Sequence, residues 1–223
     1  MSDDATRRVI AIDGASGSGK STVARAVGTL LGLPVLDTGA MYRAVALAVL
    51  EAEVDPEHEA ACLGIAQSVL IENEGVITKL DGRDVSAEIR GPAVTAIVSA
   101  VSAHPAVRHV LVGEQRAWVE AHGGGVVEGR DIGTVVFPDA PVKVFLEADP
   151  AERARRRQRD EAAADRDVAI AEVQRALDRR DSLDRSRTVS PLKAADDAVL
   201  IDTTNRSADE TAAEIAERFR ASV

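Results

Sequence analysis

The chain has 223 residues, of which 45% are hydrophobic and only 2% aromatic, and this suits one compact domain with an aliphatic core. Its formal net charge of −10 argues against general binding to nucleic acid or to an anionic membrane, and its single cysteine, Cys62, permits no intrachain disulfide. Residues 1–8 are polar and no apolar run approaches the length of a membrane span, so we expect a cytoplasmic protein.

The first elements in chain order are a strand, a turn, a helix, a strand and a helix. Residues 7–13 form a short apolar run that predicts a strand, and the glycine-rich residues 14–19 follow as a turn. Apolar residues at helical spacing predict a helix over residues 20–31. A second strand is expected over 34–37 and a second helix over 39–52. This order is typical of the start of an α/β sheet.

The middle of the chain has a different pattern. Short strand-like segments at 69–72, 76–80 and 83–86 are separated by turn residues, which indicates a small antiparallel meander. Helical patterns follow over 93–103 and 106–122. We interpret this part as an insertion into the α/β core.

The α/β alternation then resumes. The expected elements are strands at 125–128, 142–146 and 198–202 and helices at 150–160, 169–181 and 208–220. Five core strands that alternate with helices predict an α/β fold with a five-stranded, parallel, doubly wound sheet flanked by helices. Residues 161–167 are poor in apolar side chains and are expected to form a mobile tip.

A phosphate-binding motif lies between the first strand and the first helix. Residues 14–21 read GASGSGKS and match the pattern G-x-x-x-x-G-K-[ST]. In such a loop, backbone N–H groups surround a phosphate, the lysine reaches the β- and γ-phosphates, and the last hydroxyl is offered to Mg²⁺. The residues predicted to bind ATP here are Gly14, Ala15, Ser16, Gly17, Ser18, Gly19, Lys20, Ser21 and Thr22, with Ser21 as the metal ligand.

The motif alone indicates only a nucleoside triphosphate site, because GTPases, transport ATPases and small kinases share it. The chain has no N-K-x-D element to read guanine, and the apolar run at 125–128 ends in a single acid. Arginine is instead abundant, at Arg43, at Arg130 and across 180–187. Phosphoryl transfer between two phosphates concentrates negative charge, which guanidinium groups neutralise, so this pattern favours a small kinase.

Three longer segments resemble the bacterial cytidylate kinase family of P-loop nucleoside monophosphate kinases. They are DTGAMYR at 37–43, EGRDIGTVVFPDAPVK at 128–143 and RRDSLDRSRTVSPL at 179–192, and the resemblance extends from Ile10 to Ile201. It implies a P-loop core with an inserted domain for the nucleoside monophosphate and a mobile, arginine-rich helical lid. The implied reaction transfers the γ-phosphoryl group of ATP to CMP or dCMP with Mg²⁺, in a protein that we expect to be a monomer.

The resemblance assigns roles to individual residues. Those expected around CMP are Thr38, Tyr42, Arg43, Ser99, Arg108, Arg130, Asp131, Arg180, Asp184 and Arg187. Within this set, Ser99, Arg108 and Asp131 face cytosine, while Arg180 and Asp184 meet the ribose hydroxyls. Lys20, Arg130 and Arg187 are the expected catalytic residues. Arg153 and Arg157 of the lid are expected to reach ATP, and repulsion between the lid arginines is expected to keep the segment 153–167 mobile until phosphates bind.

The same resemblance divides the chain into core and insertions. The expected core segments are 1–38, 122–150 and 188–223, the insertion that binds the monophosphate spans 39–121, and the lid with its flanking helices spans 151–187. Three departures from the family pattern are Ala15 for proline, Thr38 for serine and Glu128 for aspartate, and the last leaves the role of that acid near Mg²⁺ open.

Two alternatives remain at the level of the sequence. One is a kinase for a different small acceptor, such as another nucleotide, shikimate or dephospho-coenzyme A. The other is a nucleotide-dependent binding or regulatory protein without turnover.

Overall fold

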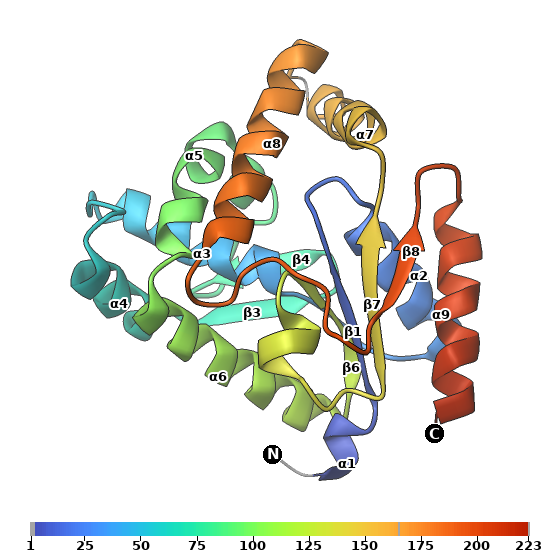
Figure 1. Ribbon diagram of the computed structural model, residues 1–223. Helices are drawn as coiled ribbons and strands as arrows, with labels where there is room; N and C mark the ends of the chain where they lie inside the picture. Colours follow the sequence, from blue (N-terminus) through green and yellow to red (C-terminus); the bar gives the residue numbers. More distant parts are fainter. Residues whose placement is uncertain (1–2, 165, 223) are drawn as a thin grey trace.

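A computed structural model describes residues 3–164 and 166–222 of the chain. It has a five-stranded parallel sheet between two layers of helices, and a pair of helices projects from the edge of the sheet where the strands end (Figure 1). This architecture confirms the predicted α/β class and the five-stranded parallel sheet.

The central sheet has the strand order β2-β6-β1-β7-β8, and every neighbouring pair is parallel. Its strands are β1 (Val9–Gly14), β2 (Val35–Asp37), β6 (Gly125–Gly129), β7 (Val142–Glu147) and β8 (Val199–Asp202). The chain leaves the central strand β1 toward β2 on one side and later builds β7 and β8 on the other. Ligands of open α/β sheets bind at such a switch point, beyond the carboxyl ends of the strands.

Alternating side chains of β1 pack into two different cores. Val9 and Ala11 belong to the larger core, under α3 (Thr38–Glu51) and α6 (Pro105–His122), whereas Ile10 and Ile12 belong to the core under α2 and α9. Successive side chains of a strand point to opposite faces, so an apolar run without alternation is what a strand covered on both sides requires.

Two helices cover the second face. They are α2 (Lys20–Leu31), which has the predicted bounds, and α9 (Ala208–Ser222). The two helices lie side by side on the same face of the sheet and pack against each other (Figure 1). Gly19 and Gly32 flank α2 with φ of 91° and 64°, a left-handed conformation that glycine adopts without strain.

The expected meander exists as a three-stranded antiparallel sheet, β3-β4-β5, beside α3. The elements of this region are β3 (Ile71–Glu74), β4 (Ile77–Leu80), β5 (Arg83–Asp84), the 3₁₀ turn η1 (Glu88–Arg90), α4 (Glu59–Ser68) and α5 (Pro92–Val101). The expected strand at 69–72 lies two residues later, because the tight turn is made by Gly75 and Val76 and not by the preceding ENE residues. The helix α4 was not expected.

The projecting pair consists of α7 (Pro150–Ala162) and α8 (Ile170–Ser186), which pack against each other (Figure 1). Helix α8 continues five residues beyond the expected end at 181, and Asp184 in this last part is buried and ion-paired in the site described below. The expected tip at 161–167 begins within α7, and Asp165 in that tip lies outside the described residues.

Two further short elements complete the fold, α1 (Asp3–Thr6) and the π-helical turn η2 (Ile132–Val136). Among the described helices, none is by itself long and apolar enough to cross a bilayer, and α5 with α6 passes that criterion only as a pair bent by 102°.

Candidate active site

A cavity of about 870 Å³ opens beyond the carboxyl ends of β1, β2 and β6. The loop after β1, the start of α3, the end of α5 and the α7–α8 pair all contribute to its lining, and basic side chains outnumber acidic ones. A cationic cavity on a chain with a net charge of −10 is suited to polyanionic ligands.

The loop between β1 and α2 is shaped to receive a phosphate. A side chain at Gly14 would place its Cβ 2.3 Å from the carbonyl oxygen of Leu146, so only glycine allows the loop to leave the sheet here. Gly19 precedes α2 with a φ of 91°, and no side chain caps the helix. The first N–H groups of α2 are therefore left for an anion.

Lys20 and Glu128 form a buried, mutually dependent pair of titratable groups at this loop. Lys20 Nζ donates to the carbonyl oxygen of Ala15 at 2.7 Å, and burial, helped by the charge of Arg130, lowers the pKa of Lys20 to about 7. Burial, helped by the charge of Asp37, raises the pKa of Glu128 to about 7, while Lys20, the Ser21 hydroxyl and Arg130 act in the opposite direction. The carboxyl of Glu128 and the hydroxyl of Ser21 thus lie together.

Asp13, the residue before the glycine-rich loop, was not singled out from the sequence. Its two carboxylate oxygens accept hydrogen bonds from the backbone N–H groups of Ile132 and Gly133, both at 2.8 Å. Burial raises its pKa to about 6, although these two hydrogen bonds oppose the shift. Asp13 therefore joins the strand that leads into the P-loop to the turn that follows Arg130.

Arg130 and Arg187 share one carboxylate. Arg130 Nε donates to Asp184 Oδ2 at 2.8 Å and its Nη1 to the carbonyl oxygen of Gly14 at 2.6 Å, while Arg187 Nη2 lies 2.6 Å from Asp184 Oδ1. Burial acts against ionisation of Asp184, but the charges of Arg130, Arg187 and Arg180 hold the pKa of this carboxyl below its ordinary value. Two of the three predicted catalytic residues are thus fixed side by side, and Arg130 also contacts the P-loop.

Arg43 and Arg180 carry charges that the protein only partly compensates. Arg43 Nη1 donates to the carbonyl oxygen of Ile89 and to the Thr95 hydroxyl, both at 2.9 Å. Arg180 Nε is buried and has no hydrogen-bond partner among the described residues. Burial and the neighbouring arginines lower the pKa of Arg43 to about 9 and that of Arg180 to about 10. An anion between these groups would relieve both effects.

The Thr38 hydroxyl, which is expected to contact the CMP phosphate, is hydrogen-bonded within the protein in this conformation. It donates to the carbonyl oxygen of Glu128 at 2.7 Å, which ties the start of α3 to β6. To donate to a phosphate, the hydroxyl would have to leave this acceptor. Asp37 caps α3 by accepting from the N–H of Ala40 at 2.9 Å and also contacts Arg90 at 3.1 Å.

A second group of residues lies deeper in the cavity, around a buried ion pair. Arg108 Nη2 lies 2.5 Å from Asp131 Oδ2, and both side chains are almost fully buried. The guanidinium carbon of Arg108 lies 5.1 Å from the centre of the Tyr42 ring. Asp131 thus pairs with Arg108 and not with its chain neighbour Arg130, and its side chain does not cap the turn η2 that follows it.

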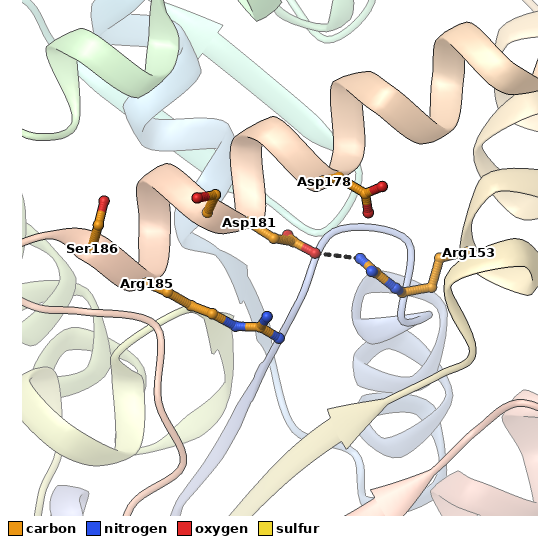
Figure 2. A pocket seen from close by; sticks show the side chains of 6 residues that line it. Arg153, Asp178, Asp181, Arg185 and Ser186 are labelled. Atoms are coloured by element: carbon orange, nitrogen blue, oxygen red, sulfur yellow. Dashed lines mark hydrogen bonds and ion pairs between the residues drawn. The ribbon is translucent and has the colours of Figure 1, made fainter.

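The two lid arginines predicted to reach ATP lie in different places. Arg157 lines the main cavity and pairs with Glu161. Arg153 instead lines a second cavity of about 430 Å³, where it pairs with Asp181 of α8 and donates to the carbonyl oxygen of Ser16 at 3.0 Å (Figure 2). Asp181 also accepts from the N–H of Ser16 at 3.2 Å, so α8 is docked directly on the P-loop.

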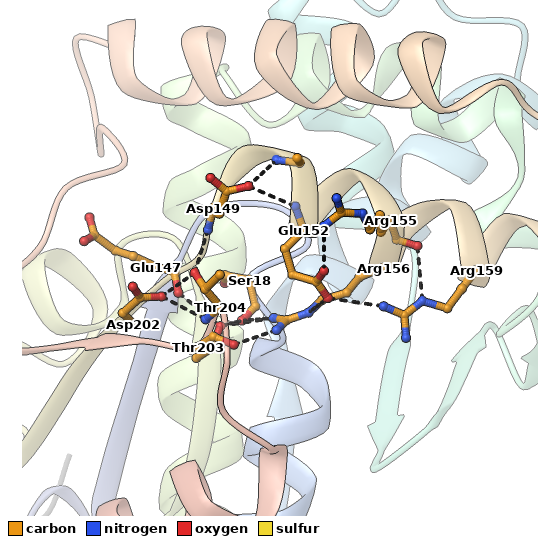
Figure 3. A network of polar contacts seen from close by, with 11 residues as sticks. Ser18, Glu147, Asp149, Glu152, Arg155, Arg156, Arg159, Asp202, Thr203 and Thr204 are labelled. Carbon is orange, nitrogen blue, oxygen red and sulfur yellow. Dashed lines mark hydrogen bonds and ion pairs between the residues drawn. The ribbon is translucent and has the colours of Figure 1, made fainter.

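Arg156, one of the arginines in the predicted lid segment 153–167, joins the start of α7 to the core. Its Nη2 donates to the carbonyl oxygen of Thr203 at 2.6 Å and its Nη1 to the Thr203 hydroxyl at 3.1 Å (Figure 3). That hydroxyl donates in turn to the carbonyl oxygen of Ser18 at 2.9 Å. The start of α7, the loop after β8 and the P-loop are thereby connected in one polar network.

The expected repulsion between lid arginines is offset within the lid itself. Glu152 contacts the three side chains of Arg155, Arg156 and Arg159, and Glu161 contacts Arg157 and Arg166. These arginines are paired with carboxylates, so repulsion between them does not by itself predict a mobile segment.

Most predicted site residues meet at the main cavity, and a few do not. Those that line it are Ser16, Gly17, Gly19, Lys20, Ser21, Thr22, Thr38, Tyr42, Arg43, Arg108, Arg130, Asp131, Arg157, Arg180, Asp184 and Arg187. Predicted residues that are not among its lining are Gly14, Ala15, Ser18, Ser99 and Arg153. Lining residues that the sequence reasoning missed include Arg25, Asp37, Arg90, Ser102 and Arg166.

Comparison with known proteins gives a consistent result. A family model described as Cytidylate kinase matches residues 10–221. The chain is 50% identical to the cytidylate kinase of Mycobacterium avium over 220 residues, which covers 95% of this chain and 93% of the relative. It is 47% identical to the cytidylate kinase of Limosilactobacillus reuteri, with 92% of each chain covered.

A solved structure supports the fold alone. An uncharacterised protein from Eubacterium ventriosum superposes with a TM-score of 0.57 at 15% identity, covering 96% of this chain and 99% of that one.

Proposed function

This chain belongs to the cytidylate kinase family, and on that premise we propose that it transfers the γ-phosphoryl group of ATP to CMP or dCMP, giving ADP and CDP or dCDP. The observation that carries the proposal is the cluster of Arg43, Arg130, Arg180 and Arg187 beside the P-loop, in which the buried Nε of Arg180 has no hydrogen-bond partner among the described residues. A P-loop binds one phosphate chain, and the arginine cluster has the charge to bind a second phosphate next to it.

The donor half consists of the loop, Lys20 and α2. In the proposed complex, the N–H groups at the start of α2 and Lys20 bind the β- and γ-phosphates of ATP. The release of Lys20 Nζ from the Ala15 carbonyl would free this group for the phosphates. Arg157 extends the positive surface from the lid side.

The acceptor half consists of the arginine cluster. A phosphate oxygen of CMP attacks the γ-phosphorus of ATP while the bond from that phosphorus to the β,γ-bridging oxygen breaks. The acceptor oxygen is already anionic, so no general base is needed, and the protein contributes positioning and charge neutralisation. Arg130 and Arg187 are suited to this role because Asp184 fixes both guanidinium groups.

Magnesium fits the residues present. The Ser21 hydroxyl and the Glu128 carboxylate are hard oxygen donors, which Mg²⁺ prefers, and they lie together at the P-loop. We propose that Ser21 binds the ion directly and that Glu128 binds one of its waters. When bound, the ion neutralises charge on the transferred phosphoryl group.

Base recognition is proposed to rest on Arg108 and Asp131, with Ser99 as a further predicted contact. Cytosine offers an amino donor at N4 and acceptors at N3 and O2, which match a carboxylate and a guanidinium. Tyr42 supports Arg108 from below through its ring face. Residues 39–121 would then act as the monophosphate-binding insertion, 151–187 as the lid region, and 1–38, 122–150 and 188–223 as the core.

A panel of acceptors tests the proposal. ADP formation is measured with ATP and Mg²⁺ and with CMP, dCMP, UMP, AMP, shikimate or no acceptor. The proposed function requires ADP with CMP or dCMP far above the other conditions. Binding of nucleotide without ADP formation would favour a regulatory protein, and ADP with another acceptor would favour a different kinase. We further propose that the enzyme acts as a cytoplasmic monomer, which sedimentation of the purified chain checks.

A further inference from the structure

Ser102 lies at the carboxyl end of α5, buried in the wall of the nucleotide cavity. Its two oxygens contact two different arginines. Arg187 Nη2 donates to its hydroxyl at 2.8 Å, and Arg108 Nη1 donates to its backbone carbonyl at 3.1 Å. The hydroxyl also donates to the carbonyl oxygen of Ser99 at 3.3 Å, which fixes the direction of its lone pairs.

The two arginines belong to different halves of the acceptor site. Arg187 shares Asp184 with Arg130 on the phosphate side, whereas Arg108 is paired with Asp131 on the base side. Ser102 is the point at which these two groups of charges meet.

The two guanidinium groups repel each other. Burial, and after it the charges of Arg108 and Arg130, lower the pKa of Arg187, while Asp184 and Asp131 act in the opposite direction. Two buried cations keep a fixed separation only if acceptors hold each of them. A neutral hydroxyl can orient Arg187 without neutralising its charge, whereas a second carboxylate would compete with the phosphate for the guanidinium.

We propose that Ser102 is a positioning residue for phosphoryl transfer, whose hydroxyl orients Arg187 toward the acceptor phosphate while its carbonyl holds Arg108 in the base site. The inference rests on the proposed function, in which Arg187 neutralises the transferred group. The helix α5, which packs against α8, thereby sets the distance between the base-reading and the phosphate-neutralising arginines.

Ser102→Ala tests the role of the hydroxyl because it leaves the carbonyl contact to Arg108 in place. A lost hydrogen bond to a charged group corresponds to about a tenfold fall in kcat with CMP. The KM for ATP should stay unchanged, and Ser102→Thr, which keeps the hydroxyl, should restore most of the loss. The matched control is Ser68→Ala at the end of α4, an exposed serine whose hydroxyl also donates three residues back, to the Ile65 carbonyl. It should behave as wild type.

A double-mutant cycle distinguishes positioning from a structural role. In an Arg187→Lys background, Ser102→Ala should lower kcat by no more than about twofold, because the contact it removes is already altered. Equal effects in both backgrounds, or a fall in thermal midpoint that accounts for the lost activity, would overturn the proposal. So would wild-type kinetics in Ser102→Ala. Absence of ADP formation by the wild-type protein with every acceptor would contradict the proposed function itself.

Discussion

The buried position of Lys20 disfavours its charged form. Burial and Arg130 lower its pKa to about 7, so most of this side chain is neutral at pH 8. Nucleotide phosphates favour the charged form, and we expect ADP binding without Mg²⁺ at pH 8 to take up close to one proton, and at pH 6 almost none. Calorimetry in two buffers of different ionisation enthalpy measures the number of protons taken up on ADP binding.

The control for this prediction is Lys20→Arg, which stays charged at both pH values. Uptake at pH 8 should then be lost, because the guanidinium is already protonated before ADP binds and has no proton to gain. The same uptake in the variant would assign the proton to another group.

Asp131 is expected to read the amino group of cytosine. In UMP the carboxylate would face the O4 lone pairs, which leaves buried polar groups unpaired and gives discrimination on the order of a few kcal/mol. Asp131→Asn should lower kcat/KM for CMP and reduce the ratio of kcat/KM for CMP to that for UMP, since an amide can donate to O4. The measurement is kcat/KM for both acceptors in both proteins, and an unchanged ratio would move base recognition away from Asp131.

Sequence reasoning at the residue scale succeeded where a residue has a local signature. The spacing from Gly14 to Ser21 is local, so the P-loop could be predicted in full, and most residues implied by the resemblance line the cavity. Asp13 and Ser102 have no such signature. An acid at the end of an apolar strand and a serine at a helix end become informative only when distant backbone groups or arginines are brought to them.

The helices α7 and α8 are expected to change most when nucleotides bind. In the structure Glu161 pairs with Arg157 and Arg166, so the proposed closure would exchange a carboxylate partner for a phosphate partner. We predict that amides of residues 153–164 exchange rapidly without ligand and become protected with an ATP–CMP bisubstrate analogue. Hydrogen exchange followed by mass spectrometry measures this.

The internal reference for the exchange experiment is β1, which is buried along its whole length and should be protected in both states. Equal protection of residues 153–164 in both states would show that no lid lies there.

Element prediction was accurate where glycines mark the ends of a helix and poorer where nothing does. Left-handed Gly19 and Gly32 gave α2 its correct bounds. The start of β3 was placed two residues early, because the glycine of the ENEG turn is the first residue of the turn and not its last. The π-helical turn η2 reads IGTVV, which has no helical spacing of apolar residues, so no pattern indicated it.

The whole molecule combines a net charge of −10 with a cationic cavity. Salt screens two interactions, the repulsion of CMP by the net negative charge and the attraction of CMP to the cationic cavity. The low-dielectric walls of the cavity strengthen the field inside it, which favours the attraction. We expect kcat/KM for CMP to fall as ionic strength rises from about 0.02 M to about 0.2 M at saturating Mg²⁺–ATP, since the Debye length shortens over this range.

Two exposed arginines provide the contrast for the salt experiment. Arg159 lines the cavity, and Arg159→Gln should reduce the slope of kcat/KM for CMP against ionic strength. Arg218, on α9 and paired with Glu214, does not line the cavity, and Arg218→Gln should leave the slope unchanged. Equal slopes in all three proteins would show that the cavity field does not guide CMP.

At this scale the alternation of strands and helices was enough to predict the parallel sheet, because a parallel connection requires a crossover helix. How the α7–α8 pair docks on the core was not predictable. It depends on Asp181 meeting Ser16 and on Arg156 meeting Thr203, contacts between residues far apart in the sequence.

The two hydrogen bonds of Asp13 have a thermodynamic consequence. They fasten the turn after Arg130 to β1, which already pairs in register with β6 from Val9 to Asp13. The donor loop and the acceptor arginine therefore belong to one solid body, whose relative placement was ordered when the chain folded. In the proposed complex, two nucleotides that bind to it become neighbours, and the protein backbone on which they lie is already ordered. Their reaction would then gain the high effective molarity of an intramolecular step before the proposed closure of α7 and α8, and the remaining binding free energy would be left to order these two helices.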